Sequence, residues 1–202
     1  MENSGKSKIA IIGLGNIGQV VAGNFVKANR PVIIADRNLD KAKELSAKWG
    51  ELSQAMEIGD AIKAADIIIL AVWFNAIKEL LYQYEGVLQG KIIVDPSNPI
   101  APNDKGGFDK IIGETESAGQ LNAALLPKGT KLAKAFGTLG AASLANAAFQ
   151  KPQSAVLFYA TDDTSIDGEI EQLILDNGFE PLRVGGIDQS IRIEVFGDLH
   201  EF

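Results

Sequence analysis

The sequence has no cysteine and only one histidine, His200, close to the carboxyl end. Without cysteine, the chain cannot form disulfides, thiolate metal sites or a cysteine nucleophile. A single histidine argues against a serine–histidine–acid triad and against a multi-histidine metal centre. His200 would titrate near neutrality, but chain ends usually fray, so we assign it no role unless a partner subunit orders the tail. We therefore expect no metal and identify no catalytic residue.

Positive charge is scarce as well: 19 Lys and Arg face 26 Asp and Glu, which gives a net charge of -7. Nucleic-acid binding needs clustered Lys and Arg, so we expect no nucleic-acid partner. No segment reaches the roughly 18 apolar residues that span a bilayer. The apolar stretch after Lys8 superficially resembles a secretory signal peptide. Asn16 and Gln19 interrupt this stretch, however, and no clean signal-peptidase cleavage site follows it. We expect a cytoplasmic protein with no membrane partner.

Short runs of Ile, Val and Leu alternate with segments of helical periodicity through the first half of the chain. Because the runs are nearly continuous, they indicate parallel strands that are covered on both faces. Helices between them give βαβ units, so we expect a doubly wound, mostly parallel α/β sheet whose order starts as 3-2-1-4-5 around the first strand. The four expected strands are residues 8–13, 31–36, 66–72 and 90–99, the last ending in a turn.

The pattern weakens after residue 99, and residues 100–114 read as an irregular surface loop. Further strands are expected at 130–139, 154–163 and 180–186. A helix capped at Thr164 or Ser165 and ended by Gly178 lies between the last two. We expect one domain over residues 1–202, with a core of about residues 6–150 and a strand–helix–strand extension of about 151–202.

Residues 13–18 read Gly-Leu-Gly-Asn-Ile-Gly and lie between the first strand and the first helix. Gly13 permits a tight turn, Gly15 lets a pyrophosphate approach the backbone, and Gly18 lets the helix pack closely on the strand. The helix that begins near Asn16 points free N–H groups at the phosphates. Asp36 ends the second strand, where a ribose-binding acid is expected. The sequence therefore predicts a Rossmann-type dinucleotide site rather than a plain turn.

The residues at the end of the second strand favour different dinucleotides. Asp36 would accept hydrogen bonds from a free ribose and repel a 2′-phosphate, which favours NAD(H). Arg37, followed by Asn38, could grip a 2′-phosphate or stack on adenine, which favours NADP(H). The alternative for Arg37 is a solvated surface charge.

Five segments resemble a known family: "IAIIGLGNIGQVVA", "IIILAVWFNAIKELL", "GKIIVDPSNP", "LPKGTKLAKAFGTL" and "AVLFYATDD" with "LILDNGFEPLRVG". Together they are similar to the NADPH-dependent deazaflavin reductases, the 8-hydroxy-5-deazaflavin:NADP oxidoreductases and their bacterial relatives. The resemblance covers nearly the whole chain. "VDPSNP" and "LPKGTKLAKAFGTL" are its more specific parts. It implies a Rossmann domain with a small C-terminal extension, a homodimer, and hydride transfer between NADPH and a flat, flavin-like ring.

The resemblance also implies a set of cofactor-binding residues. Arg37 matches the arginine that binds the 2′-phosphate, so NADP(H) is favoured and NAD(H) stays possible. Asp36 stands where serine is common, and Gly137 replaces the usual asparagine. The implied contacts are Gly13, Leu14, Gly15, Asn16 and Ile17 to the pyrophosphate; Ala71, Val72 and Trp73 along the cofactor; Asn98 and Pro99 near the nicotinamide ribose; and Ala135 and Phe136 beside the nicotinamide.

The short stretch after Leu139 leaves little material to enclose a small hydroxy acid, so an open site for a flat acceptor fits better. Hydride transfer to such a ring needs alignment more than an acid or base. Trp73 and Phe74 could wall the pocket or simply pack under a helix. We therefore expect an oxidoreductase with a flavin, deazaflavin or quinone-like small-molecule acceptor. The alternative is a non-catalytic dinucleotide-binding module or redox sensor.

Overall fold

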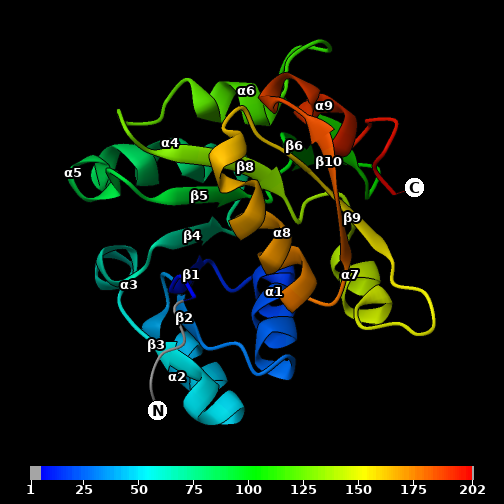
Figure 1. The fold of residues 1–202 in the computed structure, drawn as a ribbon. Coiled ribbons are helices and arrows are strands. Elements are labelled where there is room, and N and C mark those ends of the chain that lie inside the picture. Colours follow the sequence, from blue (N-terminus) through cyan, green and yellow to red (C-terminus); the bar gives the residue numbers. More distant parts are fainter. Residues whose placement is uncertain (1–5, 202) are drawn as a thin grey trace.

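The computed structural model describes residues 6–201, which form one eight-stranded sheet and a separate two-stranded hairpin (Figure 1). The order of the large sheet is β10-β9-β8-β5-β4-β1-β2-β3. All pairs are parallel except β8 with β9. The strands are β1 (Ile9–Ile12), β2 (Val32–Ala35), β3 (Ser53–Ala55), β4 (Ile67–Leu70), β5 (Ile92–Asp95), β6 (Ile100–Pro102), β7 (Phe108–Lys110), β8 (Lys131–Ala135), β9 (Val156–Ala160) and β10 (Glu180–Gly185).

Helices cover both faces of the sheet. The side chains of α1, α2, α7 and α8 pack in one hydrophobic cluster, and those of α3, α4, α5 and α6 pack in the other. No helix within residues 6–201 is long and apolar enough to cross a membrane. The helices are α1 (Asn16–Lys27), α2 (Leu39–Trp49), α3 (Ile58–Ala64), α4 (Phe74–Gln83), α5 (Glu85–Leu88), α6 (Ala118–Ala123), α7 (Ala141–Ala147), α8 (Asp167–Asp176) and α9 (Ser190–Ile193).

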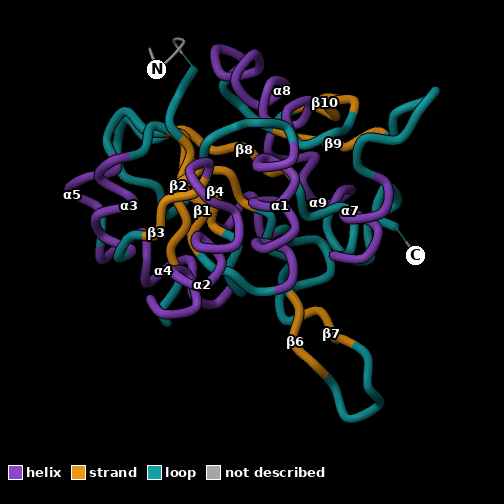
Figure 2. Tube along the Cα trace, turned by 90° about the horizontal axis from the view of Figure 1, so that it is seen from below, coloured by secondary structure: helices purple, strands orange, loops and turns teal. Residues whose placement is uncertain are grey.

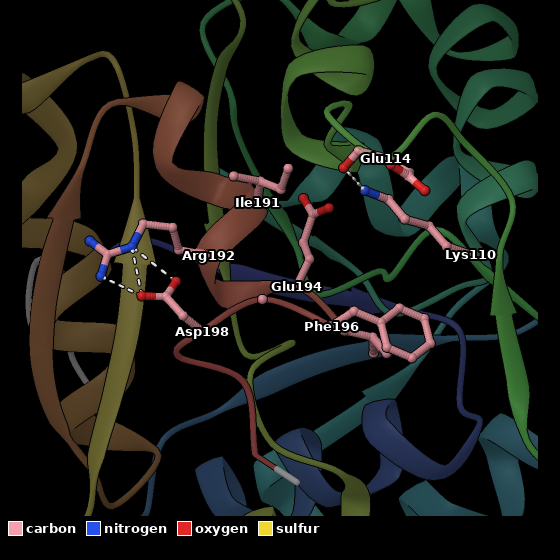
Figure 3. Close-up of a pocket in the computed structure, with 9 residues that line it drawn as sticks. Lys110, Glu114, Ile191, Arg192, Glu194, Phe196 and Asp198 are labelled. Carbon is pink, nitrogen blue, oxygen red and sulfur yellow. Dashed lines mark hydrogen bonds and ion pairs between the residues drawn. The ribbon is translucent and has the colours of Figure 1, made fainter.

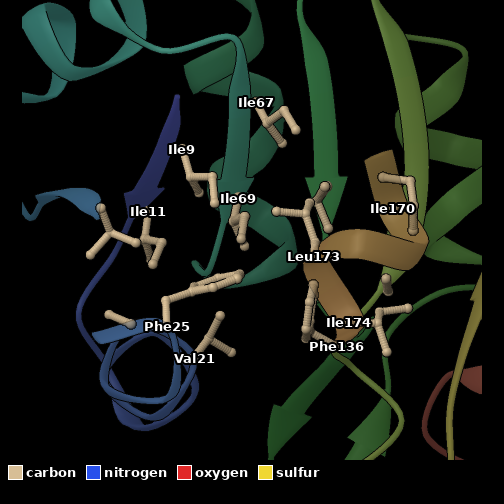
Figure 4. Close-up of a cluster of buried hydrophobic side chains, with 14 of the residues drawn as sticks. Ile9, Ile11, Val21, Phe25, Ile67, Ile69, Phe136, Ile170, Leu173 and Ile174 are labelled. Atoms are coloured by element: carbon tan, nitrogen blue, oxygen red, sulfur yellow. The ribbon is translucent and has the colours of Figure 1, made fainter. Parts of the chain in front are cut away.

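The central strand β1 shows why the sheet is buried on both sides. Ile9 and Ile11 belong to the cluster that contains Phe25 of α1, whereas Ala10 and Ile12 belong to the opposite cluster (Figure 4). All four strand residues are almost fully buried. Burying one isoleucine side chain contributes about 1.5–3 kcal/mol relative to leaving it exposed, so the uninterrupted apolar runs account for the layered core.

The predicted fold class and the central position of the first strand are confirmed. β1 pairs in parallel with β2 on one side and with β4 on the other, and the sheet contains the order 3-2-1-4-5. The prediction counted residues 66–72 as the third strand, which is wrong. The third strand is β3, a three-residue edge strand of sequence Ser-Gln-Ala. With no apolar run, β3 leaves no sequence signal.

The prediction of an irregular loop at residues 100–114 is also wrong in part, because β6 and β7 form an antiparallel hairpin there. Figure 2 shows this hairpin projecting from the body of the molecule. Its strands are three residues each. The Asn103 side chain closes the turn by accepting from Gly107 N at 2.9 Å and donating to Asp109 at 2.9 Å. Strands of three residues are too short to show the alternation of apolar and polar residues that predicts a hairpin, so the sequence does not indicate this one.

The predicted cap of the helix after β9 is displaced by one residue. Asp163, not Thr164 or Ser165, caps a short 3₁₀ turn by accepting from Ser165 N at 3.0 Å, and α8 follows that turn. Ser165 and the Lys131 side chain lower the pKa of Asp163 by donating hydrogen bonds to its carboxylate. α8 ends at Asp176, and the predicted terminating residue Gly178 follows the C-cap Asn177 with φ 90°. Asp163 is thus the cap of this turn.

Candidate functional site

The glycine loop lies at the carboxyl end of β1, and two of its glycines are required by the chain itself. Gly13 has φ 94°, and its N–H donates to Ala35 O at 2.8 Å. A Cβ at Gly13 would overlap the carbonyl oxygen of Ala71, and one at Gly18 would overlap that of Gly13. Any side chain at these positions would push the loop after β1 away from the loop after β4.

Gly15 is different, because nothing in the described chain requires it. Its φ is -68°, a value open to every residue, and no atom lies within 4 Å of where its Cβ would be. The residue is exposed at the start of α1. The open space above Gly15 therefore has no structural explanation from the chain's own packing.

Unpaired hydrogen-bond donors surround this space. Within residues 6–201 no backbone group accepts from the N–H groups of Gly15, Asn16 and Ile17. These groups form the amino end of α1, a helix of 12 residues. Free N–H groups and the positive end of the helix dipole together attract an anion such as a pyrophosphate.

Asp36 joins the ends of β1 and β2. One carboxylate oxygen accepts from Leu14 N at 2.8 Å and the other from Asn38 N at 3.0 Å. A carboxylate has about four lone-pair positions, so each oxygen retains capacity for another donor. Asp36 is thus held on the backbone of the loop and can still accept from a ribose hydroxyl.

The two residues after Asp36 differ in their partners. Asn38 caps α2, because its Oδ1 accepts from Asp40 N at 3.1 Å and from Lys41 N at 3.2 Å. The Arg37 side chain is exposed, and the described chain offers its guanidinium no hydrogen-bond or ion-pair partner. Arg37 is therefore available to a ligand, whereas the Oδ1 atom of Asn38 is already engaged in capping.

The loop after β4 lies against the glycine loop. Ala71 and Val72 both reach the position that a Cβ of Gly13 would occupy, with Val72 Cγ1 2.8 Å from it. Trp73 caps α4 through its backbone and leaves 58% of its surface exposed. Its ring contacts that of Phe108 on the hairpin. Phe74 begins α4 and is half-buried.

The turn after β5 is bound to other parts of the chain. Asn98 donates through Nδ2 to Gly137 O at 2.9 Å and accepts through Oδ1 from Val195 N at 2.8 Å. Pro99 is buried. A Cβ at Gly137 would overlap the carbonyl oxygen of Pro96, so this turn excludes the asparagine that the resemblance would place there. Asn98 thus joins three segments of the chain.

The carboxyl end of β8 contributes backbone rather than side chains. Ala135 and Phe136 are both fully buried. Phe136 adopts φ 64°, and its ring packs edge-on against Phe25 of α1 at 6.4 Å between centroids. The side chain of Phe136 therefore lies in the core.

A buried ionic network beside this edge was missed by the sequence analysis. Lys134 Nζ lies 3.1 Å from Asp95 Oδ2 and 3.7 Å from Glu194 Oε1, and it also contacts the carbonyl of Ser97. All three charged side chains are at most 2% exposed. β8 is buried from Leu132 to Ala135, so a lysine inside it is an indication of a buried ion pair, but the partners of Lys134 lie far away in sequence and leave no signal.

The C-terminal segment, residues 190–201, is ordered on the sheet without any partner subunit. The Glu194 carboxylate accepts from the N–H groups of Ala118 and Gly119 at 2.9 Å each. Glu201 N donates to Thr138 O at 3.1 Å, and the Glu201 side chain accepts from Gly140 N. Long-range hydrogen bonds therefore join this segment to the rest of the described chain.

A cavity of about 380 Å³ opens between this segment and the hairpin (Figure 3). Arg192 and Asp198 on its wall form an ion pair with N–O distances down to 2.8 Å. The Asp198 hydrogen bonds raise the pKa of Arg192, and those of Arg192 lower the pKa of Asp198. Lys110 donates to the carbonyls of Glu114 and Glu116. No cluster of three or more acidic or histidine side chains suited to a metal occurs within residues 6–201.

Comparisons with known proteins agree with this geometry. The uncharacterized oxidoreductase YfjR of Bacillus subtilis is 30% identical over 41% of this chain and 29% of its own length. An F420-dependent NADP reductase of Methanothermobacter marburgensis is 27% identical over 68% of this chain and 66% of its own length. The chain thus spans less than two thirds of either curated relative. The crystal structure of hypothetical protein SMa0349 from Sinorhizobium meliloti superimposes with a TM-score of 0.86 at 30% identity, covering 97% of this chain and 94% of that one.

Residues 8–99 match the family described as NADP oxidoreductase coenzyme F420-dependent. That stretch contains the glycine loop, Asp36, Arg37 and the loops after β4 and β5. The features that distinguish an anion-binding loop from a plain turn therefore lie inside the matched residues. Over residues 8–99 the chain is therefore similar to the F420-dependent NADP oxidoreductases.

Proposed function

We propose that the protein transfers hydride between NADP(H) and a flat flavin, deazaflavin or quinone-like acceptor. The observation that carries this proposal is the open space at Gly15, bordered by N–H groups that have no acceptor in the described chain. When bound, a reduced nicotinamide supplies a hydride, that is, two electrons with one proton, and the oxidised acceptor takes it together with a solvent proton where its reduced form requires one.

The residues of the glycine loop have different roles in binding the dinucleotide. The N–H groups of Gly15, Asn16 and Ile17 and the α1 dipole bind the pyrophosphate. The N–H of Leu14 already donates to Asp36, so Leu14 acts by fixing that carboxylate. Gly13 keeps the loop close to Ala71 and Val72, which then border the cofactor on its other side.

The preference for NADP(H) rests on Arg37 and Asp36. Arg37 is exposed and unpaired, so its guanidinium can bind a 2′-phosphate with two hydrogen bonds. Asp36 is held by two backbone N–H groups, which offset part of the negative charge that would repel the phosphate. Because its oxygens keep free lone pairs, NAD(H) is also tolerated.

The edge formed by β5 and β8 positions the reacting ends. Hydride transfer depends on distance and alignment, so rigid loops matter more there than an acid or base. The Lys134–Asp95–Glu194 network and the two hydrogen bonds of Asn98 supply this rigidity.

Anaerobic mixing of the protein with NADPH or NADH and riboflavin, 5-deazariboflavin or menadione tests the proposal. We expect loss of reduced-nicotinamide absorbance with at least one acceptor, faster with NADPH than with NADH. Tight cofactor binding without oxidation by any acceptor would contradict the enzyme and favour the redox sensor.

A further inference from the structure

Two large aromatic side chains near the site remain exposed in the monomer. Trp73 is 58% exposed and Phe108 is 48% exposed. Their ring centroids are 6.5 Å apart and the rings are tilted by 43°. Aromatic pairs span about 4.5–7 Å, so this contact is at the loose end of the range. Neither ring is buried by its neighbour.

The pair bridges the loops after β4 and β5. Trp73 directly follows Val72, which borders Gly13 in the glycine loop. Phe108 belongs to the hairpin, which begins one residue after Pro99 in the turn after β5. In the sheet, β4 and β5 lie on the opposite side of β1 from β2, where Asp36 and Arg37 mark the adenosine end. The pair therefore lies at the other end of the crevice, where the reaction occurs.

The hairpin does not use the Phe108 ring to hold its shape. The side chain of Asn103 closes the turn, and Ile111 N donates to Pro99 O at 2.9 Å at the base. Trp73 and Phe108 are exposed next to each other rather than scattered singly, and adjoining exposed apolar side chains can form a ligand-binding surface. Aromatic faces favour flat ligands, on which they stack.

We propose that Trp73 and Phe108 bind the flat ring of the electron acceptor and set its position over the cofactor. This inference rests on the proposed function, because it presumes a ring-shaped acceptor. Side chains alternate along a strand, so Phe108 and Lys110 lie on the same face of β7. Lys110 lines the cavity of about 380 Å³, so this cavity begins on the same face of β7 as Phe108.

Kinetics of single variants test the pair. Trp73→Ala and Phe108→Ala should each raise the KM for riboflavin or 5-deazariboflavin about tenfold, the scale of a lost aromatic contact. The Kd for NADPH should stay the same in Phe108→Ala, and Trp73→Phe should retain most of the acceptor affinity. Tyr82→Ala is the matched control, since Tyr82 is an 82% exposed aromatic residue at the opposite end of α4.

A binding measurement separates this inference from turnover. The chain has two tryptophans, so Trp49→Phe leaves Trp73 as the single emitter. With NADP⁺ present, oxidised riboflavin or 5-deazariboflavin should quench Trp73 saturably, and adding Phe108→Ala should shift the midpoint about tenfold. No reaction occurs in this mixture, because both partners are oxidised.

The outcomes separate the two claims. If the wild type oxidises NADPH but the alanine variants behave like Tyr82→Ala, the proposed function stands and the stacking pair is wrong. The pair is equally wrong if Phe108→Ala loses NADPH affinity as much as acceptor affinity, or if quenching never saturates. Saturable quenching with no turnover would support the ring site and contradict the transfer. A wild type that binds no NADPH would overturn both.

Discussion

Two halves of the carboxyl edge of the sheet, the loop after β1 and the loops after β5 and β8, differ in whether their hydrogen-bonding groups have partners. After β1, the N–H groups of Gly15, Asn16 and Ile17 have no partner among the described residues, and the space above Gly15 is empty. After β5 and β8, Asn98 and Lys134 are bound to the chain's own C-terminal segment. Within residues 6–201, one half keeps N–H groups without an acceptor, and we call it the open half; the other, the closed half, is held by long-range contacts.

From this difference we expect the open half to determine ligand affinity and the closed half to hold the chain in position. Substitutions in the open half should change ligand affinity while the fold persists, because no intramolecular contact is lost. Substitutions in the closed half should change stability first, because buried charges lose their partners. The predictions below test that division, beginning with the largest expected effect.

Lys134→Met should destabilise the protein by about 3–5 kcal/mol, because it leaves Asp95 and Glu194 buried without their cation. Urea unfolding followed by circular dichroism measures the change. Lys63→Met is the control, since Lys63 pairs with Asp60 on the surface and should contribute less than about 1 kcal/mol. Equal losses for both variants would contradict a closed, charge-dependent half.

Arg37→Ala should weaken NADPH binding by about 1–3 kcal/mol, the cost of a lost charged hydrogen bond, without changing the urea midpoint. Asp36→Ser should tighten NADPH by removing a repulsive carboxylate. Titration of both cofactors by nicotinamide fluorescence measures these effects. If Arg37→Ala leaves NADPH affinity intact while Asp36→Ser weakens NADH, the protein is an NAD enzyme.

The smallest effect concerns Asp198, whose pKa is lowered by its ion pair with Arg192. A depressed carboxyl pKa stabilises the native state above the unfolded value, and that contribution is lost as the pH falls through the folded pKa. Acid should therefore loosen the C-terminal segment slightly, and Asp198→Asn should remove this step. Urea midpoints from pH 6 downward, about two pH units above the ordinary carboxyl pKa, would show it. A step that survives in Asp198→Asn would assign it to another group.

The sequence predicts the open half well because its signals are local. Continuous apolar strands, the spacing of Gly13, Gly15 and Gly18, and the position of Asp36 are all short-range patterns. The fold class follows from them. The homodimer and the cytoplasmic location stay predictions.

The closed half could not be predicted, because its contacts join distant residues. Lys134 meets Asp95 39 positions away, and Val195 N reaches Asn98 97 positions away. Phe136 was expected beside the nicotinamide, but its left-handed backbone turns the ring into the core against Phe25. No local pattern encodes such a turn.

The measurement closest to the central claim is NADPH affinity in Gly15→Asp, compared with Gly168→Asp. Both positions are exposed, near the start of a helix, and have no atom within 4 Å of a new Cβ. Both variants should keep their free energy of unfolding within about 0.5 kcal/mol. We expect Gly15→Asp to lose NADPH binding, because its carboxylate would occupy and repel the pyrophosphate position, while Gly168→Asp binds normally. Unchanged NADPH affinity in folded Gly15→Asp would show that the loop is only a turn.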